Sequence, residues 1–239
     1  MSESAQVHVV VAPVFGTNCC IVAAPGAGAG PRDCVIIDAG AGVSDGVARV
    51  VEEQGLRPRA VLATHGHADH TWDAAGLCDR YDIPLRLHAA DAYRLADPFG
   101  TLSGDGGEAI VSGALGQELA GLGFSPETYR VPARIEGIEM PDGAADLAFG
   151  ALTLRAVHAP GHTEGSTLYL LDEPFGIAFT GDVLFAGSIG RTDLPGGDGA
   201  TMRSTVHDVV GRLAPSLTVV PGHGPTTTVQ RELATNPFL

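Results

Sequence analysis

Lysine is absent from this sequence. All 14 basic residues are arginines, they stand against 28 acidic residues, and the formal net charge is −14. Without lysine, chemistry that passes through a Schiff base on a lysine amine is excluded. The excess of negative charge disfavours nucleic acids and anionic membranes, because both are repelled by an anionic surface. We therefore expect a small-molecule substrate as partner, with no nucleic acid and no membrane.

Long apolar runs are also missing. No stretch approaches the ~18 consecutive apolar residues that a membrane-spanning helix needs. The first four residues, Met1-Ser2-Glu3-Ser4, have neither the basic segment nor the apolar run of a signal peptide. Both absences predict a cytoplasmic protein.

Aromatic residues and cysteines are few. Aromatics make up 5% of the chain, so the core has to be built mainly from Val, Leu, Ile and Ala. The four cysteines, Cys19, Cys20, Cys34 and Cys78, form no C-x-x-C pair. We expect them to be buried small hydrophobic residues in a reducing compartment.

The chain has no linker long enough to separate two domains, so we expect a single domain over residues 1–239. Strands are predicted at residues 7–14, 19–23, 34–38, 59–64, 84–88, 152–159, 166–171, 176–180 and 217–220. Helices are predicted at residues 44–55 with Ser44 as N-cap, 71–81, 108–122, 200–213, and from 227 to just before Asn236. This order favours sheets packed on each other with helices outside, and the irregular stretch 97–145 is typical of a lid or binding loop.

The segment Thr64-His65-Gly66-His67-Ala68-Asp69-His70 carries three histidines and a carboxylate within six residues, directly after an apolar strand. Neutral imidazole and ionised carboxylate are the usual ligands of zinc. Gly66 allows a tight bend, so His65 and His67 can point to one metal while Asp69 and His70 turn to a second. A polar turn that happens to be rich in histidine is the alternative, and the rarity of histidine argues against it.

Three further segments place a glycine and a ligand-type residue after a predicted strand. They are Pro160-Gly161-His162-Thr163, Thr180-Gly181-Asp182 and Pro221-Gly222-His223-Gly224. Each is weak alone, because a single His or Asp after a strand more often forms a cap or a turn. Together with the first segment they supply seven ligand-type residues, about the number that two bridged metals in four- to five-coordinate sites need. The carboxyl ends of several strands are where α/β folds tend to build sites.

These motifs resemble those of the metallo-β-lactamase fold superfamily and, within it, the glyoxalase II-like hydroxyacylglutathione hydrolases. Residues 187–195 and the ending Asn236-Pro237-Phe238-Leu239 also resemble that group. Only sixteen residues follow His223, so the chain is similar to the shorter, single-domain branch, without the C-terminal helical domain that helps bind glutathione. The resemblance implies an α/β fold, a four-layer αββα sandwich with the site along one edge.

The resemblance also implies a ligand set for two divalent metal ions, with zinc expected and iron as the alternative. One metal is held by His65, His67 and His162, the other by Asp69, His70 and His223, and Asp182 bridges both. The activity implied is hydrolysis of a small hydroxyacyl thioester by a hydroxide that bridges the metals, whose water precursor is acidified by coordination. Asp69 and Asp182 are then the catalytic residues that place charge and orient water. A thiolate leaving group needs no protein acid, because a thiol has a pKa near 8.5.

Arg191 is a candidate substrate-binding residue. It lies in a Gly-rich loop after Asp182, and its guanidinium could bind a substrate carboxylate that the negative surface would otherwise repel. The alternative, equally weighted, is an ion pair with Asp193 or another nearby carboxylate. The histidines not assigned to a metal are expected to be structural or at the surface: His8, His88, His158 and His207.

A second hypothesis belongs to a different reaction class. Persulfide dioxygenases resemble the same motif set but use one non-haem iron held by two His and one Asp. Here those ligands are His65, His162 and Asp182. Two zinc ions and thiol release favour the hydrolase, whereas one iron and oxygen uptake on a persulfide favour the dioxygenase.

Overall fold

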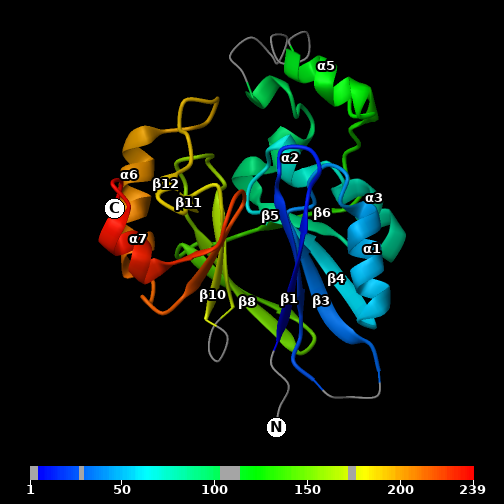
Figure 1. Cartoon of the computed structure of the whole chain (residues 1–239), viewed down its shortest axis with the longest axis horizontal. Coiled ribbons are helices and arrows are strands. Elements are labelled where there is room, and N and C mark those ends of the chain that lie inside the picture. Colours follow the sequence, from blue (N-terminus) through cyan, green and yellow to red (C-terminus); the bar gives the residue numbers. More distant parts are fainter. Residues whose placement is uncertain (1–4, 27–29, 103–113, 172–175) are drawn as a thin grey trace.

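The computed structural model describes residues 5–26, 30–102, 114–171 and 176–239 (Figure 1). Its strands form two six-stranded sheets and a two-stranded ribbon. The first sheet, in spatial order, consists of β1 (Gln6–Val11), β2 (Asn18–Ala23), β3 (Arg32–Ile37), β4 (Leu56–Leu62), β5 (Leu85–His88) and β6 (Ile135–Ile138). The second, in spatial order, consists of β14 (Thr227–Thr228), β13 (Thr218–Pro221), β10 (Ile177–Gly181), β9 (Thr167–Leu171), β8 (Leu152–His158) and β7 (Ala144–Phe149). The ribbon pairs β11 (Leu184–Phe185) with β12 (Ser188–Ile189).

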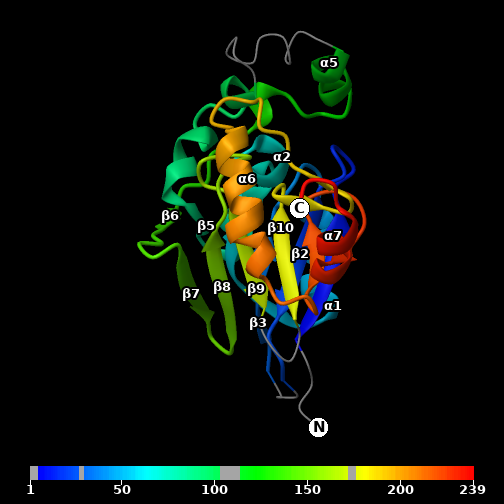
Figure 2. The ribbon, with the colours of Figure 1, turned by 90° about the vertical axis from the view of Figure 1, so that its left-hand side faces the viewer.

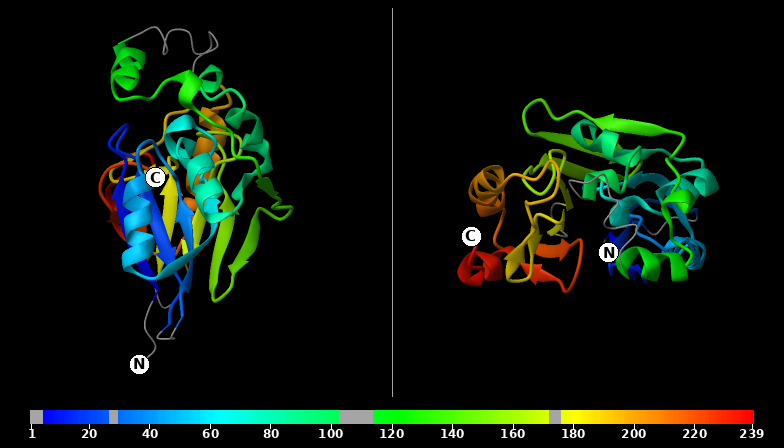
Figure 3. Two further views of the ribbon diagram at one scale, coloured as in Figure 1. Left: turned by 90° about the vertical axis from the view of Figure 1, so that its right-hand side faces the viewer. Right: turned by 90° about the horizontal axis from the view of Figure 1, so that it is seen from above.

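Helices cover the outer faces of both sheets. The first sheet is covered by α1 (Ser44–Glu53) and α3 (Ala74–Tyr81), and the second by α6 (Gly199–Asp208) and α7 (Val229–Thr235) (Figure 1). Figure 2 shows α6 in front of the second sheet, and the left view of Figure 3 shows α1 in front of the first. The predicted αββα sandwich is therefore confirmed.

The remaining helical segments are short. They are α2 (Ala68–Thr71), α5 (Ala114–Gly121) and the 3-10 turns Ala89–Leu95, Gly100–Leu102, Pro126–Thr128 and Val210–Arg212. In the described part of the chain, no helix has the length and apolar character needed to cross a lipid bilayer.

The central strands are buried on both faces. Along β2, Cys20 and Val22 belong to the core between the sheets, whereas Cys19 and Ile21 belong to the core under α1 and α3. Successive side chains of a strand point to opposite faces, so a strand between two apolar layers is a continuous apolar run. The predicted burial of the four cysteines is confirmed, and all four are free thiols.

The stretch 97–145 contains strands that the sequence prediction missed. β6 pairs in parallel with β5, and the first residues of β7 pair antiparallel with β8. Both lie at the edge of a sheet, and about half of their residues face solvent, so their sequences lack a clear apolar signal. The helix predicted at 108–122 corresponds to α5, while residues 103–113 lie outside the described part of the chain.

Two predicted helix details are wrong. The helix predicted at 71–81 is divided into α2 and α3, and the N-cap of α1 is Val43 rather than Ser44. Ser44 is already helical, and its backbone N–H donates to Asp73 Oδ2 at 2.8 Å. Because Asp73, from the adjacent helical segment, accepts this bond, the Ser44 hydroxyl is not needed as a cap.

Candidate metal centre

The seven predicted ligand residues lie on segments that follow strands of both sheets. His65 and His67 follow β4, with Asp69 and His70 in the short helix α2 directly after them. The other three follow strands of the second sheet: His162 follows β8, Asp182 follows β10 and His223 follows β13. β10 and β13 are parallel, so their carboxyl ends reach the same edge of the sheet.

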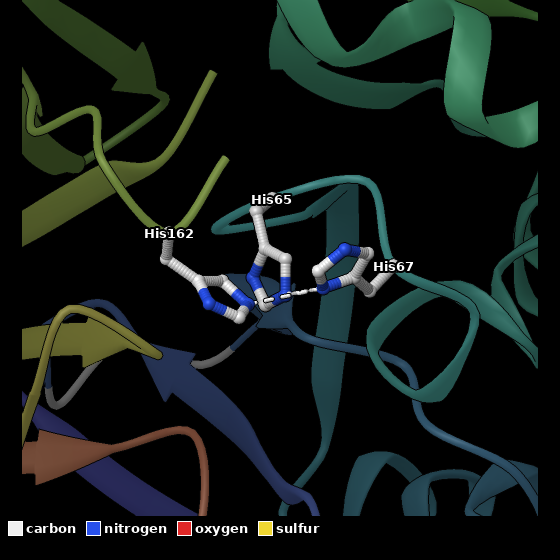
Figure 4. Close-up of side chains that lie close together, drawn as sticks. All are labelled: His65, His67 and His162. Atoms are coloured by element: carbon white, nitrogen blue, oxygen red, sulfur yellow. Dashed lines mark hydrogen bonds between the residues drawn. The ribbon is translucent and has the colours of Figure 1, made fainter. Parts of the chain in front are cut away.

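Three histidines converge in a first ligand group, defined here as His65, His67 and His162 (Figure 4). His67 Nδ1 lies 3.0 Å from His65 Nε2 and 3.0 Å from His162 Nε2. All three side chains are almost fully buried. Three imidazole nitrogens that meet at one point are typical of a site for a zinc-like cation.

A second ligand group, defined as Asp69, His70 and His223, lies beside the first. His223 Nε2 is 3.2 Å from both His70 Nε2 and Asp69 Oδ2, and His70 Nε2 is 3.6 Å from Asp69 Oδ2. The rings of His65 and His70 have centroids 4.1 Å apart, so the two groups are neighbours.

Asp182 lies between the two groups. Its Oδ2 is 3.7 Å from His162 Nε2, while its Oδ1 is 3.4 Å from His70 Nε2 and 3.7 Å from His223 Nε2. Oδ1 is buried and has no hydrogen-bond partner among the described residues. A buried, unpartnered carboxylate oxygen surrounded by imidazole nitrogens fits a cation, because uncompensated burial of such a group is costly. The donor set therefore fits divalent metal ions.

Two histidines of the first group, His65 and His67, are neutral. Burial lowers the pKa of His67 to about 3, with the neighbouring His162 adding to the effect. Burial, followed by the charge of His70, lowers the pKa of His65 well below its ordinary value. Neutral imidazole is the form that binds a metal, so these side chains are available as ligands at neutral pH.

The carboxylates of the centre are ionised. Burial opposes ionisation of Asp69 and Asp182, but nearby imidazoles, His70 first among them, hold the pKa of each below its ordinary value. Burial likewise opposes the charged form of His70, yet Asp69, Asp38 and Asp182 raise its pKa well above the usual value. A cation of higher charge would take over this role of the imidazolium and leave His70 neutral as a ligand.

Hydrogen bonds set the tautomers of the ligand rings. His162 Nδ1 donates to the carbonyl oxygen of Arg191 at 2.8 Å, and His223 Nδ1 donates to that of Phe15 at 3.0 Å. Both rings therefore carry a proton on Nδ1 and turn Nε2 into the centre. Such second hydrogen bonds orient metal-binding histidines in general.

Asp38 supports the centre and was missed in the sequence. It lies just after β3 with φ 57° and is almost fully buried. Its Oδ1 accepts from Thr64 N at 2.8 Å, and its Oδ2 accepts from Thr64 Oγ1 at 2.9 Å and lies 3.0 Å from His70 Nδ1. Asp38 thus connects the start of the histidine segment to His70. A carboxylate directly after an apolar strand, as at Asp182, was the signal that could have found it.

Asp91 joins the two loops that carry the first ligand group. Its Oδ2 accepts from Gly66 N at 2.8 Å and Thr163 Oγ1 at 2.7 Å. Its Oδ1 accepts from Gly165 N at 2.7 Å and lies 3.3 Å from Arg94 Nε. The carboxylate is fully buried. It lies in a 3-10 turn without any motif, so the sequence held no signal for this role.

Glycine is required at positions 66 and 181 for different structural reasons. The chain bends just before Gly66, which does not adopt a positive φ. A Cβ there would instead lie 2.8 Å from the carbonyl oxygen of Asp91 and 3.0 Å from Arg94 Cβ, so close packing requires glycine. Gly181 has φ 48°, and a Cβ there would also collide with Thr64.

Arg191 forms the ion pair that was the alternative to substrate binding. Its Nε and Nη2 lie 2.7 Å from Asp193 Oδ1 and Oδ2, respectively. The remaining histidines lie outside both ligand groups. His88 and His158 stack with centroids 4.2 Å apart, and His158 Nε2 donates to the carbonyl oxygen of Glu164 at 2.8 Å.

Comparison with other sequences identifies the family of the chain. The profile of the metallo-β-lactamase superfamily matches residues 12–226. An uncharacterised protein of Mycobacterium tuberculosis is 35% identical over 233 residues, which cover 95% of each chain. The probable metallo-hydrolase YqgX of Bacillus subtilis is 34% identical, covering 86% of this chain and 87% of that one. The hydroxyacylglutathione hydrolase GloC of Haemophilus influenzae is 28% identical, with 98% of each chain covered.

Solved structures share the fold. The BLEG-1 B3 metallo-β-lactamase superposes with a TM-score of 0.77 at 29% identity, covering 98% of this chain and 99% of that one. TTHA1623 in a di-iron-bound form superposes with a TM-score of 0.73 at 30% identity, covering 97% and 100%. ETHE1 from Myxococcus xanthus, at 21% identity and a TM-score of 0.69 over 97% of this chain and 83% of that one, is similar in fold alone. The sandwich, the convergent His and Asp side chains and the profile match together establish that the chain belongs to the metallo-β-lactamase superfamily.

Proposed function

We propose that this metal-dependent hydrolase cleaves a small hydroxyacyl thioester, with two divalent metal ions held by the two ligand groups. The placement of Asp182 carries the proposal. Its two carboxylate oxygens face different groups, and Oδ1 is buried without a hydrogen-bond partner among the described residues. The similarity to the hydroxyacylglutathione hydrolase of Haemophilus influenzae supports the thioester as substrate class.

Each residue has a distinct role in this proposal. His65, His67 and His162 would hold one ion, and Asp69, His70 and His223 would hold the other. Asp182, whose carboxylate faces both groups, would help to hold both ions. The carboxylates of Asp69 and Asp182 would also be the acceptors that orient a water in the centre.

When bound, the metal ions would supply Lewis acidity and lower the pKa of a coordinated water to about 7. Net hydrolysis adds water across the C–S bond, which yields a hydroxy acid and a thiol. The thiolate leaves without a proton from the protein, because a thiol has a pKa near 8.5.

Metal analysis and a thioester assay test the proposal together. The protein is purified, its metals are measured per chain, and thiol release is followed with the lactoyl thioester of N-acetylcysteamine, a small neutral thiol. We expect two divalent ions per chain, zinc or iron, and metal-dependent thiol release. Reloading the metal-free protein with zinc or iron in turn identifies the ion that supports turnover.

The persulfide dioxygenase is the competing function in this test. It requires a single iron held by His65, His162 and Asp182, and oxygen uptake on a persulfide. One iron per chain, oxygen uptake and no thiol release would therefore overturn the hydrolase. The second ligand group argues against the dioxygenase, because Asp69 and His223 would then be left without a cation.

A further inference from the structure

An apolar pocket opens beside the second ligand group. It has a volume of about 180 Å³, and Asp69 and Arg191 are the charged residues in its lining. The rest of the lining is apolar, and the side chains that matter here are Phe15, Trp72, Phe99, Leu102, Leu119 and Leu194. Asp69 thus belongs both to the proposed metal centre and to the pocket, so a molecule at the metals would reach into this space.

The aromatic wall of the pocket is tied to the metal centre. Trp72 directly follows α2, the helix of Asp69 and His70, and is almost fully buried. Its ring meets those of Phe99, Phe124 and Tyr129 edge to face, with centroids 5.8, 5.5 and 5.6 Å away and interplanar angles of 80° to 84°. Aromatic pairs in this arrangement are stabilising, so the wall has a defined position relative to the ligands.

The pocket offers no free cation among its described residues. Arg191 is the one basic residue of the described lining, and its Nε and Nη2 each donate a hydrogen bond of 2.7 Å to the carboxylate of Asp193. The formal net charge of the chain is −14. A thiol carrier with two carboxylates, such as glutathione, would therefore meet no unpaired cationic side chain among the described residues of the pocket.

We propose that this pocket binds an uncharged, apolar substituent of the thioester, carried on either its acyl group or its thiol. The inference rests on the proposed thioester hydrolysis, which it narrows to thioesters with an aromatic or branched aliphatic group. Removing such a group from water favours binding in proportion to its apolar area. A polar or charged carrier gains no comparable binding free energy from this pocket.

Four lactoyl or mandeloyl thioesters test the proposal and distinguish the two ends of the substrate. Lactoyl-N-acetylcysteamine is the small neutral reference. Mandeloyl-N-acetylcysteamine adds a phenyl ring to the acyl side, lactoyl benzyl thioester adds one to the thiol side, and lactoylglutathione has a charged carrier. We expect kcat/KM for one of the two phenyl substrates to exceed the reference and lactoylglutathione by about tenfold to a hundredfold, as pocket contacts commonly give. Equal or better turnover of lactoylglutathione would overturn the proposal.

Binding is measured without catalysis through Trp72, the only tryptophan of the chain. The probe is N-acetyl-S-benzylcysteamine, a thioether that cannot be hydrolysed. We expect a saturable change in tryptophan fluorescence, and no such change with S-methylglutathione. If no thioester is hydrolysed, the proposed function fails, yet saturation by the thioether still supports the pocket. Absence of saturation overturns it whatever the thioester assays show.

Leu194→Asn is the matched variant. It replaces an apolar wall residue by a polar one of similar size, and we expect the preference for the phenyl substrate and the affinity for the thioether to fall about tenfold. Leu233→Asn makes the same change at an exposed position of α7 outside the pocket and should alter neither. Thermal unfolding of both variants checks that they fold, and an unchanged preference in folded Leu194→Asn contradicts the proposal.

A further variant tests the part of the proposal that concerns the charge of the thiol carrier. Asp193→Asn removes the carboxylate that neutralises Arg191, so the guanidinium becomes free to bind a carboxylate of the carrier. We expect KM for lactoylglutathione to fall several-fold, while fluorescence saturation by the neutral thioether stays the same. An unchanged KM for lactoylglutathione would contradict the claim that the Arg191–Asp193 ion pair disfavours charged carriers.

Discussion

At the scale of single residues, the centre depends on carboxylates that are buried and held by several partners. Asp182 faces both ligand groups, Asp38 links Thr64 to His70, and Asp91 joins the loops of His65 and His162. The first contributes charge to the centre, whereas the other two position side chains that do. Substitution of Asp182 should therefore have different consequences from substitution of Asp38 or Asp91.

Asp182→Asn should lower metal content and activity together. The amide keeps the size of the side chain but loses the negative charge and one of the two acceptor oxygens that face the ligand groups. We expect fewer than two metal ions per chain and a loss of thioester hydrolysis of at least about a hundredfold, of the order found when a key electrostatic group is removed. Metal analysis and kcat/KM measure both effects.

Asp142→Asn is the control for this variant, because Asp142 is exposed in the turn between β6 and β7. It should leave metal content and activity unchanged. Full activity in metal-replete Asp182→Asn would contradict the bridging role.

Asp91→Asn should loosen the first ligand group without removing a ligand. An amide nitrogen cannot accept the bonds that Gly66 N, Gly165 N and Thr163 Oγ1 donate, so at least one buried donor is left unpaired. An unsatisfied buried donor costs about 1–3 kcal/mol. We expect a lower unfolding midpoint and a metal affinity reduced by about 10- to 100-fold, as for other residues that orient metal ligands.

Titration of the metal-free variant with zinc, followed by a competing chelator dye, gives the affinity of Asp91→Asn directly. A structural role alone would move only the unfolding midpoint. An unchanged zinc affinity would therefore exclude Asp91 as a positioning residue.

At the scale of elements, the stability of the sandwich comes from helices packed on sheets. Leu77 of α3 is fully buried in the core of the first sheet with Val61 and Leu85. The metal ligands sit on loops and on the short helix α2 beyond the strands, so the side chains that build this core are not those that would bind metal. Position in the layers therefore predicts which property a substitution changes.

Leu77→Ala should destabilise the fold and spare the centre. A buried Leu→Ala change costs about 2–5 kcal/mol, because the lost contacts leave a cavity. We expect the denaturation midpoint to fall accordingly, while the metal content of the folded protein stays the same. Leu122→Ala, at a side chain that is 57% exposed, should have little effect on either. Equal stabilities of the two variants in urea would show that α3 does not contribute to the core as described.

At the scale of the whole molecule, the centre connects the two sheets. Residues of the histidine segment come from the first sheet, and His162, Asp182 and His223 come from the second. Asn18 Nδ2 of β2 also donates to the carbonyl oxygens of Pro221 and Gly224, each at 3.0 Å, across the same boundary. Ions held by both sets of ligands would stabilise the packing of one sheet on the other.

Metal removal should therefore lower the unfolding temperature. A ligand that binds only the folded state at a hundred times its Kd adds about 2.7 kcal/mol to stability. For a chain of this size that corresponds to several degrees, at roughly 2–4 °C per kcal/mol. Calorimetry before and after dialysis against a chelator measures the shift, and zinc should restore it. The same treatment of Asp182→Asn should give a smaller shift, and an identical midpoint with and without chelator would contradict a metal shared by the sheets.

Two predictions at this scale stay predictions: a single domain over residues 1–239 and a cytoplasmic location. The same holds for the small-molecule partner and for the absence of nucleic acid and membrane partners, which rest on the net charge of −14.

The sequence by itself determined the ligand types and the fold class. His65, His67, Asp69 and His70 are close because they are covalent neighbours, and a histidine or aspartate after a strand and a glycine could be recognised at positions 162, 182 and 223. Apolar runs also marked most strands of the two sheets. Spacing between residues that are close along the chain is fixed by covalent connectivity, so it can be recognised directly in the sequence.

Only the tertiary structure decided that the ligands from the two sheets meet in one centre and that Asp38 and Asp91 support them. It also decided that an apolar pocket lies beside Asp69. These features depend on how two sheets pack and on which side chains then meet. Contacts between residues 25 to more than 150 positions apart leave no local pattern in the sequence, because packing, not chain connectivity, brings them together.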